Sequence, residues 1–204
     1  MLSKLAKKYG TDKGAKKHRY TDIYERWLSP YRKKEFFMIE IGIDKGASLK
    51  MWLDYFPQAF ISGVDPFLDN NKDYKDDIIK IDESRLKCFE GYQSDLEILE
   101  QMSVNSPFIV IDDGSHRSSD QCVSLAYLFK NMKRGGLYFI EDLNCRRTIG
   151  NSPTMIFILK YFIKTGKIDR AFINDIDAEY LESNIDFCKI YNNKICVIKK
   201  KNKE

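Results

Sequence analysis

The sequence predicts an α/β fold, with a mostly parallel sheet that carries helices on both faces and ends in an antiparallel hairpin. Short apolar runs alternate with helical patterns along most of the chain, as in βαβ units around a buried parallel sheet. After Gly150 the pattern changes to two alternating segments on either side of Asn192-Asn193, a pair typical of a hairpin turn. No linker or repeat divides the sequence, so we expect residues 1–204 to form one domain.

Seven apolar or alternating segments are the predicted strands. The parallel strands are expected at residues 36–41, 59–64, 86–89, 108–111 and 137–140, and the antiparallel pair at residues 183–191 and 194–199. A mostly parallel doubly wound sheet binds its ligand at the carboxyl ends of the strands. The residues that directly follow each strand are therefore the candidates for a functional site.

The predicted helices lie between or before these strands. They cover residues 21–28, 48–55 and 119–132. The last of them has the clearest limits, because a capping box from Ser118 to Gln121 precedes it and Gly135-Gly136 follows it. Residues 1–34 are expected to be an N-terminal helical segment, either a lid over the cofactor or acceptor, or a helix that packs on the sheet.

The composition is that of a globular protein, 43% hydrophobic and 31% charged. Five cysteines without a CxxC pair indicate neither a disulfide framework nor a thiolate zinc site, which favours a reducing, cytoplasmic compartment. The longest apolar run, residues 155–159, is too short to span a membrane. Part of the net charge of +4 lies in residues 199–204, which we interpret as a solvated basic tail and not as a nucleic-acid-binding stripe.

A candidate cofactor turn follows the first strand. Gly42 and Gly46 allow the backbone to approach a ligand, and the helix that starts near Ser48 presents free N–H groups. Asp65 ends the second strand, where an acidic residue commonly accepts hydrogen bonds from a ribose. Alternatives stay open for both, since a glycine here can serve strand-to-helix packing and Asp65 can be a turn residue before Pro66.

The third strand leads into Gln93 and Ser94, whose polar groups could read an adenine edge. Ser94 could equally be the N-cap of the next helix.

Four carboxylates and a histidine follow the fourth and fifth strands. Asp112 and Asp113 end one strand and Glu141 and Asp142 the next, and neighbouring parallel strands bring such residues to one rim. A cluster of this kind repels itself and attracts a hard divalent cation, magnesium or, as the alternative, manganese. His116 lies on the turn after Asp113, where it could take a proton from a hydroxyl or ligate the metal.

These motifs together resemble one family, the mycinamicin-type sugar O-methyltransferases and their bacterial polysaccharide relatives. The resemblance covers roughly residues 7 to 143. It is carried by the strings Tyr9-Gly10-Thr11-Asp12-Lys13, His18-Arg19-Tyr20-Thr21, Glu40-Ile41-Gly42, Ser48-Leu49-Lys50-Met51-Trp52, Asp112-Asp113-Gly114-Ser115-His116 and Gly135-Gly136-Leu137-Tyr138-Phe139-Ile140-Glu141-Asp142.

The resemblance implies a Rossmann-like class I methyltransferase fold with a seven-stranded sheet. It implies a metal held by Asp113, Glu141 and Asp142, with His116 as the general base. Tyr92 departs from the family, whose members often carry an acidic residue there. The cofactor, S-adenosylmethionine, is expected to lie against Glu40 and Gly42 at its methionine part, Asp65 at its ribose and Gln93 and Ser94 near its adenine, with Lys13, Tyr20, Ser48 and Asp112 as further candidates.

The implied reaction is transfer of a methyl group from S-adenosylmethionine to a hydroxyl of a sugar or glycan acceptor, assisted by Mg²⁺. Three alternatives stay open: a catechol-type small-molecule O-methyltransferase, a metal-dependent hydrolase, and a non-catalytic cofactor-binding domain. We expect neither a nucleic-acid partner nor a membrane span. Homo-oligomerisation and attachment to a larger glycan-modifying polypeptide are both compatible with the sequence.

Overall fold

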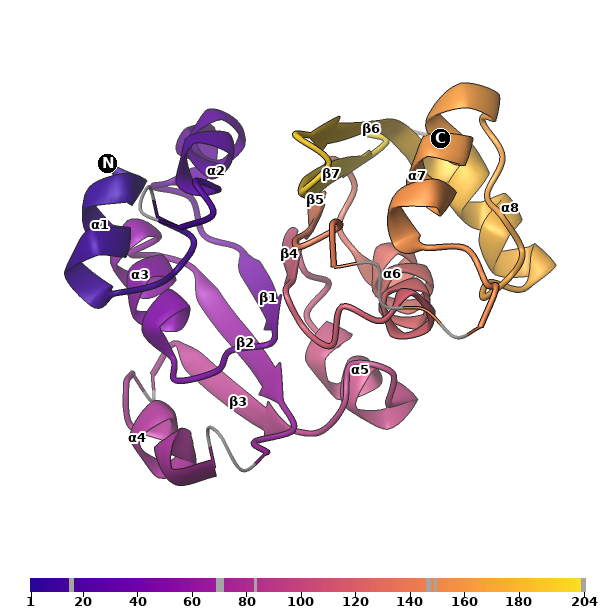
Figure 1. Ribbon diagram of the computed structural model, residues 1–204. Helices are drawn as coiled ribbons and strands as arrows, with labels where there is room; N and C mark the ends of the chain where they lie inside the picture. Colours follow the sequence, from indigo (N-terminus) through magenta and orange to yellow (C-terminus); the bar gives the residue numbers. More distant parts are fainter. Residues whose placement is uncertain (15–16, 69–71, 83, 146–147, 149, 203–204) are drawn as a thin grey trace.

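In the computed structural model, residues 1–14, 17–68, 72–82, 84–145, 148 and 150–202 are described. They form one seven-stranded sheet with helices on both faces (Figure 1). The strands are β1 (Phe37–Ile41), β2 (Phe60–Asp65), β3 (Leu86–Glu90), β4 (Ile109–Asp112), β5 (Leu137–Ile140), β6 (Ile185–Tyr191) and β7 (Ile195–Lys200). The helices are α1 (Leu2–Tyr9), α2 (Thr21–Leu28), α3 (Ala47–Tyr55), α4 (Lys75–Ile79), α5 (Leu96–Ser103), α6 (Ser118–Asn131), α7 (Met155–Thr165) and α8 (Asp175–Asn184), with 3-10 turns at Ser29–Tyr31 and Lys72–Tyr74.

The strand order is β3-β2-β1-β4-β5-β7-β6. Strands β1 to β5 pair in parallel, whereas β7 is antiparallel to both β5 and β6. The predicted parallel sheet with a C-terminal antiparallel hairpin is therefore confirmed. The chain first extends the sheet from β1 towards β3 and then continues from β4 on the other side of β1, which leaves a crevice at the carboxyl ends of β1 and β4.

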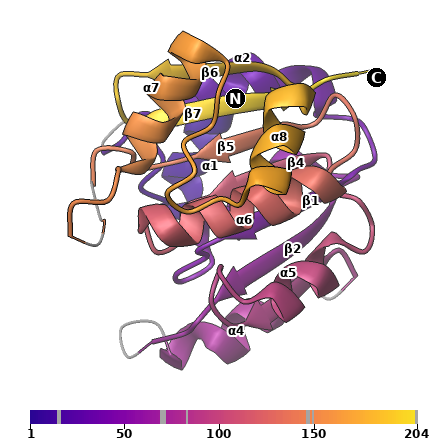
Figure 2. The ribbon, with the colours of Figure 1, turned by 90° about the vertical axis from the view of Figure 1, so that its right-hand side faces the viewer.

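Two apolar clusters cover the two faces of the sheet. One packs α5, α6, α7 and α8 against one face, and the other packs α1, α2 and α3 against the opposite face. Figure 2 looks onto the first of these helical layers, with α6 crossing in front of the sheet. Strands buried on both faces read as continuous apolar runs, and β4 and β5 are fully buried along their length.

The N-terminal segment forms part of the core. Leu2 and Ala6 of α1 and Tyr24 and Leu28 of α2 have at most 1% of their surface exposed. Helix α1 packs against α2 and α3, and Tyr24 of α2 packs against Phe139 of β5, while a lid role for this segment stays a prediction. Between them, the chain runs past the carboxyl end of the sheet, where Lys13 contacts Asp113.

The turn between β6 and β7 is the two-residue hairpin turn that Asn192-Asn193 predicts. Asn192 and Asn193 both have left-handed backbone, with φ of 51° and 53°, which matches the twist of a two-residue hairpin. No helix among the described residues is both long and apolar enough to cross a bilayer.

Two local predictions were wrong. Ser118 is the first residue of α6, whose N-cap is Arg117, and the Ser118 hydroxyl accepts a hydrogen bond from the backbone N–H of Met155 instead of forming a capping box. The predicted solvated tail at residues 199–204 is wrong for its first two residues, and residues 203–204 lie outside the described part of the chain. Lys199 and Lys200 belong to β7, and Lys200 is 3% exposed, because its ammonium donates to three carbonyl groups at the end of α6.

Candidate active site

A cavity of about 620 Å³ lies at the carboxyl ends of the strands, in the crevice beside β1 and β4. The loops after β1, β2, β3, β4 and β5 and the segment after α1 all contribute to its wall. Of the residues singled out from the sequence, the wall contains Lys13, Gly42, Ser48, Asp65, Gln93, Asp113, His116 and Asp142. Although they too are among the described residues, Tyr20, Glu40, Ser94, Asp112 and Glu141 do not line it.

The turn after β1 is held in place from two sides. Gly42 has φ of 78°, and a Cβ there would lie 2.1 Å from the carbonyl oxygen of Asp113, so glycine lets the turns after β1 and β4 approach each other. One oxygen of Asp65 accepts from the N–H groups of Ile43 and Asp44, and the other from Phe67. Asp65 therefore shapes the turn while also lining the cavity, so both of its predicted roles stay open.

Glu40 faces α3 and not the cavity. Its two oxygens accept hydrogen bonds from the Ser48 hydroxyl at 3.0 Å and from the Trp52 indole at 2.9 Å. The residue is fully buried, and burial raises the pKa of its carboxyl to about 7, against the opposing effects of Lys13 and the two hydrogen bonds. Any influence of Glu40 on a cofactor would therefore pass through its neighbours.

Asp112 and Gln93 form a buried pair between the cavity and the core. The Gln93 amide nitrogen donates to both oxygens of Asp112 at 3.1 Å, and its amide oxygen accepts from the N–H of Ser115 at 2.6 Å. Burial raises the pKa of Asp112 to about 6. Gln93 thus ties the end of β3 to the turn that carries His116, while Ser94 is exposed and the N-cap of α5 is its neighbour Asp95.

Asp113, His116 and Asp142 converge at one side of the cavity. One ligand atom from each of the three lies within 4.8 Å of the others, and His116 Nε2 lies 3.8 Å from Asp142 Oδ2. His116 and Asp142 both have left-handed backbone, with φ of 56° and 52°, a costly conformation for residues other than glycine. The unfavourable backbone conformation therefore occurs at the two residues whose side chains meet beside the cavity.

Glu141 departs from the predicted metal set. Its carboxylate accepts a hydrogen bond from the Tyr24 hydroxyl and lies 3.0 Å from Lys13 Nζ, and 2% of its surface is exposed. Burial and the neighbouring Asp113 raise the pKa of its carboxyl well above the usual range. Glu141 and Asp142 directly follow β5, yet Glu141 contacts Lys13 and Tyr24 whereas Asp142 lines the cavity.

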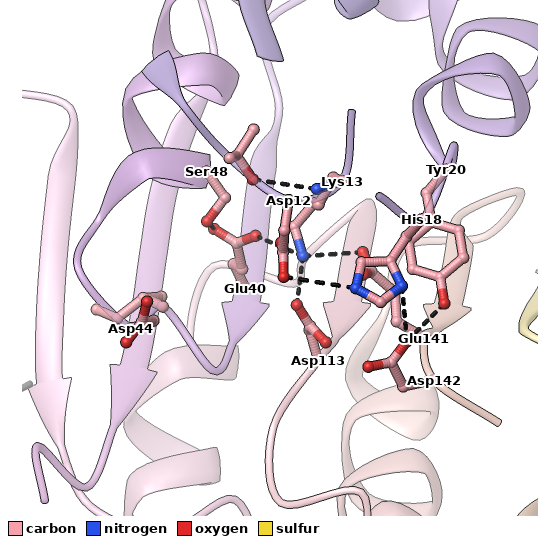
Figure 3. A network of polar contacts seen from close by, with 12 residues as sticks. Asp12, Lys13, His18, Tyr20, Glu40, Asp44, Ser48, Asp113, Glu141 and Asp142 are labelled. Carbon is pink, nitrogen blue, oxygen red and sulfur yellow. Dashed lines mark hydrogen bonds and ion pairs between the residues drawn. The ribbon is translucent and has the colours of Figure 1, made fainter. Parts of the chain in front are cut away.

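The segment before α2 contacts Asp142 as well (Figure 3). The Tyr20 hydroxyl donates to Asp142 Oδ1 at 2.5 Å, and the imidazole of His18 stacks on Tyr20 with its Nδ1 3.7 Å from the same oxygen. Sequence reasoning assigns no role to His18 or Tyr24. His18 and Tyr20 belong to one of the strings that carry the family resemblance, but no local pattern shows which strand this string reaches.

The three convergent groups fit a divalent cation. Two carboxylates and an imidazole are donors that Mg²⁺ or Mn²⁺ accepts. The Nδ1 atom of His116 is also buried without a hydrogen-bond partner among the described residues, so the imidazole has unused capacity beside the carboxylates. As placed here, Glu141 would have to leave Lys13 and Tyr24 before it could join such a ligand set.

The chain is similar in sequence to several curated O-methyltransferases. No protein-family model matches it. It is 36% identical over 151 residues to mycinamicin VI 2''-O-methyltransferase of Micromonospora griseorubida, a match that covers 70% of the chain and 36% of that relative. An equal identity and coverage relate it to 8-demethyl-8-(2-methoxy-alpha-L-rhamnosyl)-tetracenomycin-C 3'-O-methyltransferase of Streptomyces olivaceus. The match thus spans little more than a third of the length of these relatives.

A solved structure agrees with the sequence matches. The MycE methyltransferase of the mycinamycin biosynthetic pathway, in complex with Mg, SAH and mycinamycin VI, superposes with a TM-score of 0.79 at 30% identity, over 100% of the chain and 55% of MycE. A putative caffeoyl-CoA O-methyltransferase of Staphylococcus aureus, at 11% identity and a TM-score of 0.56, shares the fold alone. The chain is therefore similar in sequence to part of the mycinamicin-type sugar O-methyltransferases, and it has the class I methyltransferase fold of MycE.

Proposed function

We propose that the protein transfers a methyl group from S-adenosylmethionine to a hydroxyl of a sugar or glycan, with a divalent cation at Asp113 and Asp142 and with His116 as the general base. The observation that carries this proposal is the convergence of these three side chains within 4.8 Å beside a cavity of about 620 Å³. The relatives that methylate sugars and the magnesium in the MycE complex support it.

The cavity offers groups suited to the cofactor. Asp65 ends β2, where its carboxylate can meet a ribose, and Gln93 lies in the next loop along the sheet. Ala47 and Ser48, in the first turn of α3, line the same space, and the first N–H groups of a helix lack partners within it. The SAH in the MycE complex supports S-adenosylmethionine as the methyl donor.

His116 is suited to remove the proton of the acceptor hydroxyl. Its imidazole is 17% exposed, lines the cavity, and has Asp142 as its acidic neighbour at 3.8 Å. A bound Mg²⁺ would lower the cost of the developing alkoxide. Asp113 and Asp142 would orient the hydroxyl in line with the methyl group by holding that cation, and general-base help is typically worth about 10² to 10⁴ in rate.

Substitution of His116 shows whether this residue acts as the general base or as a metal ligand. We expect His116→Ala to lower kcat by at least about 10²-fold with the Kd for S-adenosylhomocysteine and for Mg²⁺ unchanged, as measured by calorimetry. A variant that turns over like the wild type would remove the base assignment. A variant with greatly weakened Mg²⁺ binding would instead make the imidazole a metal ligand.

Metal removal tests the role of the cation. We expect methyl transfer to stop in excess EDTA and to return when Mg²⁺ is added back. Full activity after metal loss has been verified by elemental analysis would eliminate the metal-assisted mechanism.

The acceptor class is tested by a screen of glycosides against catechols. Methylation of catechols alone would favour the small-molecule alternative, and cofactor binding without turnover across a broad glycan panel would favour a non-catalytic domain. A cytoplasmic location, and either homo-oligomerisation or attachment to a larger glycan-modifying polypeptide, stay predictions.

A further inference from the structure

Lys13 occupies an unusual position for a lysine. Its side chain is 2% exposed, and its ammonium lies 2.5 Å from Asp113 Oδ2, 3.0 Å from Glu141 Oε1 and 3.8 Å from Glu40 Oε1 (Figure 3). Although burial lowers its pKa, these three carboxylates raise it well above the ordinary value, so Lys13 stays charged. Its role is therefore electrostatic, and its ammonium is already engaged with protein groups.

The ammonium is a cation inside the acidic cluster. It lies between Asp113 and Glu141, and a divalent cation at Asp113 would bring further positive charge beside it. Asp113 is shared by both arrangements, because it contacts Lys13 and also belongs to the group that could hold a metal. An ammonium and a divalent cation so close together repel each other, and both draw on the carboxylate of Asp113.

The backbone connects Lys13 to the cavity and to α2. Lys13 lines the cavity together with Gly10 and Thr11, and its carbonyl oxygen accepts from the N–H of Thr21 at the start of α2. The ion pairs of Lys13 thus hold the chain that follows α1 against Asp113 and Glu141.

We propose that Lys13 is a positioning residue that holds Asp113 in place when no metal is bound and that yields it to the divalent cation when it binds. This inference rests on the metal dependence in the proposed function. Because the cation and Lys13 compete, removal of the ammonium strengthens metal binding while it weakens the metal-free protein. Removal of a lysine with only a packing role would weaken the metal-free protein but would not strengthen metal binding.

The test compares Lys13→Gln with Lys13→Arg and with the wild type by Mg²⁺ titration in calorimetry and thermal unfolding. We expect Lys13→Gln to have a lower Tm without metal, a larger Tm gain with Mg²⁺ and an Mg²⁺ affinity about tenfold or more tighter than wild type. Lys13→Arg keeps the charge and should bind Mg²⁺ about as the wild type does. Lys17→Gln removes an exposed charge from the same segment and is the matched control.

The outcomes separate the inference from the proposed function. Wild-type binding of Mg²⁺ with no tighter binding by Lys13→Gln overturns the role of Lys13 alone. No Mg²⁺ binding by wild type or variants overturns the metal-assisted function and this inference with it.

A second measurement needs no variant and covers the possibility that Lys13→Gln does not fold. An acylating N-hydroxysuccinimide ester is applied to the wild-type protein with and without Mg²⁺, and labelled lysines are identified by mass spectrometry. We expect Lys13 to be protected without metal and labelled faster with Mg²⁺, while the exposed Lys17 is labelled equally in both. If Lys13 is equally protected with and without saturating Mg²⁺, the cation does not displace its ammonium and the proposed role of Lys13 is wrong.

Discussion

At the scale of single residues, the main electrostatic cost of the site lies in carboxyl groups that are buried beside one another. Glu40 shows this clearly. It is fully buried and has a pKa of about 7 in the folded protein, against about 4.5 for an exposed glutamate. The folded state therefore binds this proton more tightly than the unfolded state does. The stabilisation from Glu40 is complete below pH 4.5 and is lost as the pH rises through about 7.

We expect Glu40→Gln to remove this part of the pH dependence. In the wild type, the contribution of Glu40 to the free energy of unfolding should fall by on the order of 3 kcal/mol between about pH 4.5 and pH 8, since one pKa unit corresponds to about 1.4 kcal/mol. Urea unfolding of both proteins across this range measures the difference. Parallel curves for wild type and variant would contradict the raised pKa.

Gly42 is a second residue whose role is local and steric. We expect Gly42→Ala to cost about 3 kcal/mol or more, because the added Cβ would meet the Asp113 carbonyl oxygen at 2.1 Å on a backbone with φ of 78°. Gly166→Ala is the matched control. Gly166 has φ of 72°, but no atom lies within 4 Å of the position that an added Cβ would take, so the loss should be about 1 to 2 kcal/mol. Equal losses in urea unfolding would show that backbone strain alone explains both.

At the scale of elements, the last strand stabilises the end of a helix that packs on the sheet. The ammonium of Lys200 donates to the carbonyl oxygens of Phe129, Lys130 and Met132 at 2.8 to 2.9 Å. The last carbonyl groups of a helix lack partners within the helix and carry its negative dipole end, so a buried cation satisfies both needs of α6.

We expect Lys200→Met to destabilise the protein by about 3 kcal/mol, because it leaves three carbonyl groups at the end of α6 without their charged donor. Lys199→Met is the control from the same strand. Lys199 pairs with Asp186 at the surface, and such a pair contributes about 0 to 1 kcal/mol. Similar losses for the two variants in urea unfolding would show that Lys200 does not cap α6.

At the scale of the whole molecule, the parallel sheet gathers residues that are far apart in the chain. Lys13 and Asp113 are 100 positions apart, yet they meet at 2.5 Å because β1 and β4 are neighbours and the segment after α1 crosses their ends. The cavity proposed for the cofactor is lined by the same loops. Binding in that cavity should therefore stabilise the whole fold.

We expect S-adenosylhomocysteine at about 100 times its Kd to stabilise the protein by about 2.7 kcal/mol, which corresponds to a Tm increase of roughly 5 to 10 °C for a chain of this length. Thermal unfolding with and without the ligand measures it, with adenosine as the control for binding of the nucleoside part alone. No increase in Tm with S-adenosylhomocysteine would favour the metal-dependent hydrolase.

The sequence alone determined the position and type of the strands along the chain, the fold class, and the edge of the sheet at which Asp113, His116 and Asp142 meet. These follow from apolar periodicity and from the rule that parallel strands end at one edge of a sheet, both of which are readable along the chain. The tertiary structure decided which way each carboxylate faces. It placed Glu141 on Lys13 and Tyr24, and it turned Lys200 from a predicted tail into a helix cap, because such pairings depend on contacts between distant segments that no local pattern encodes.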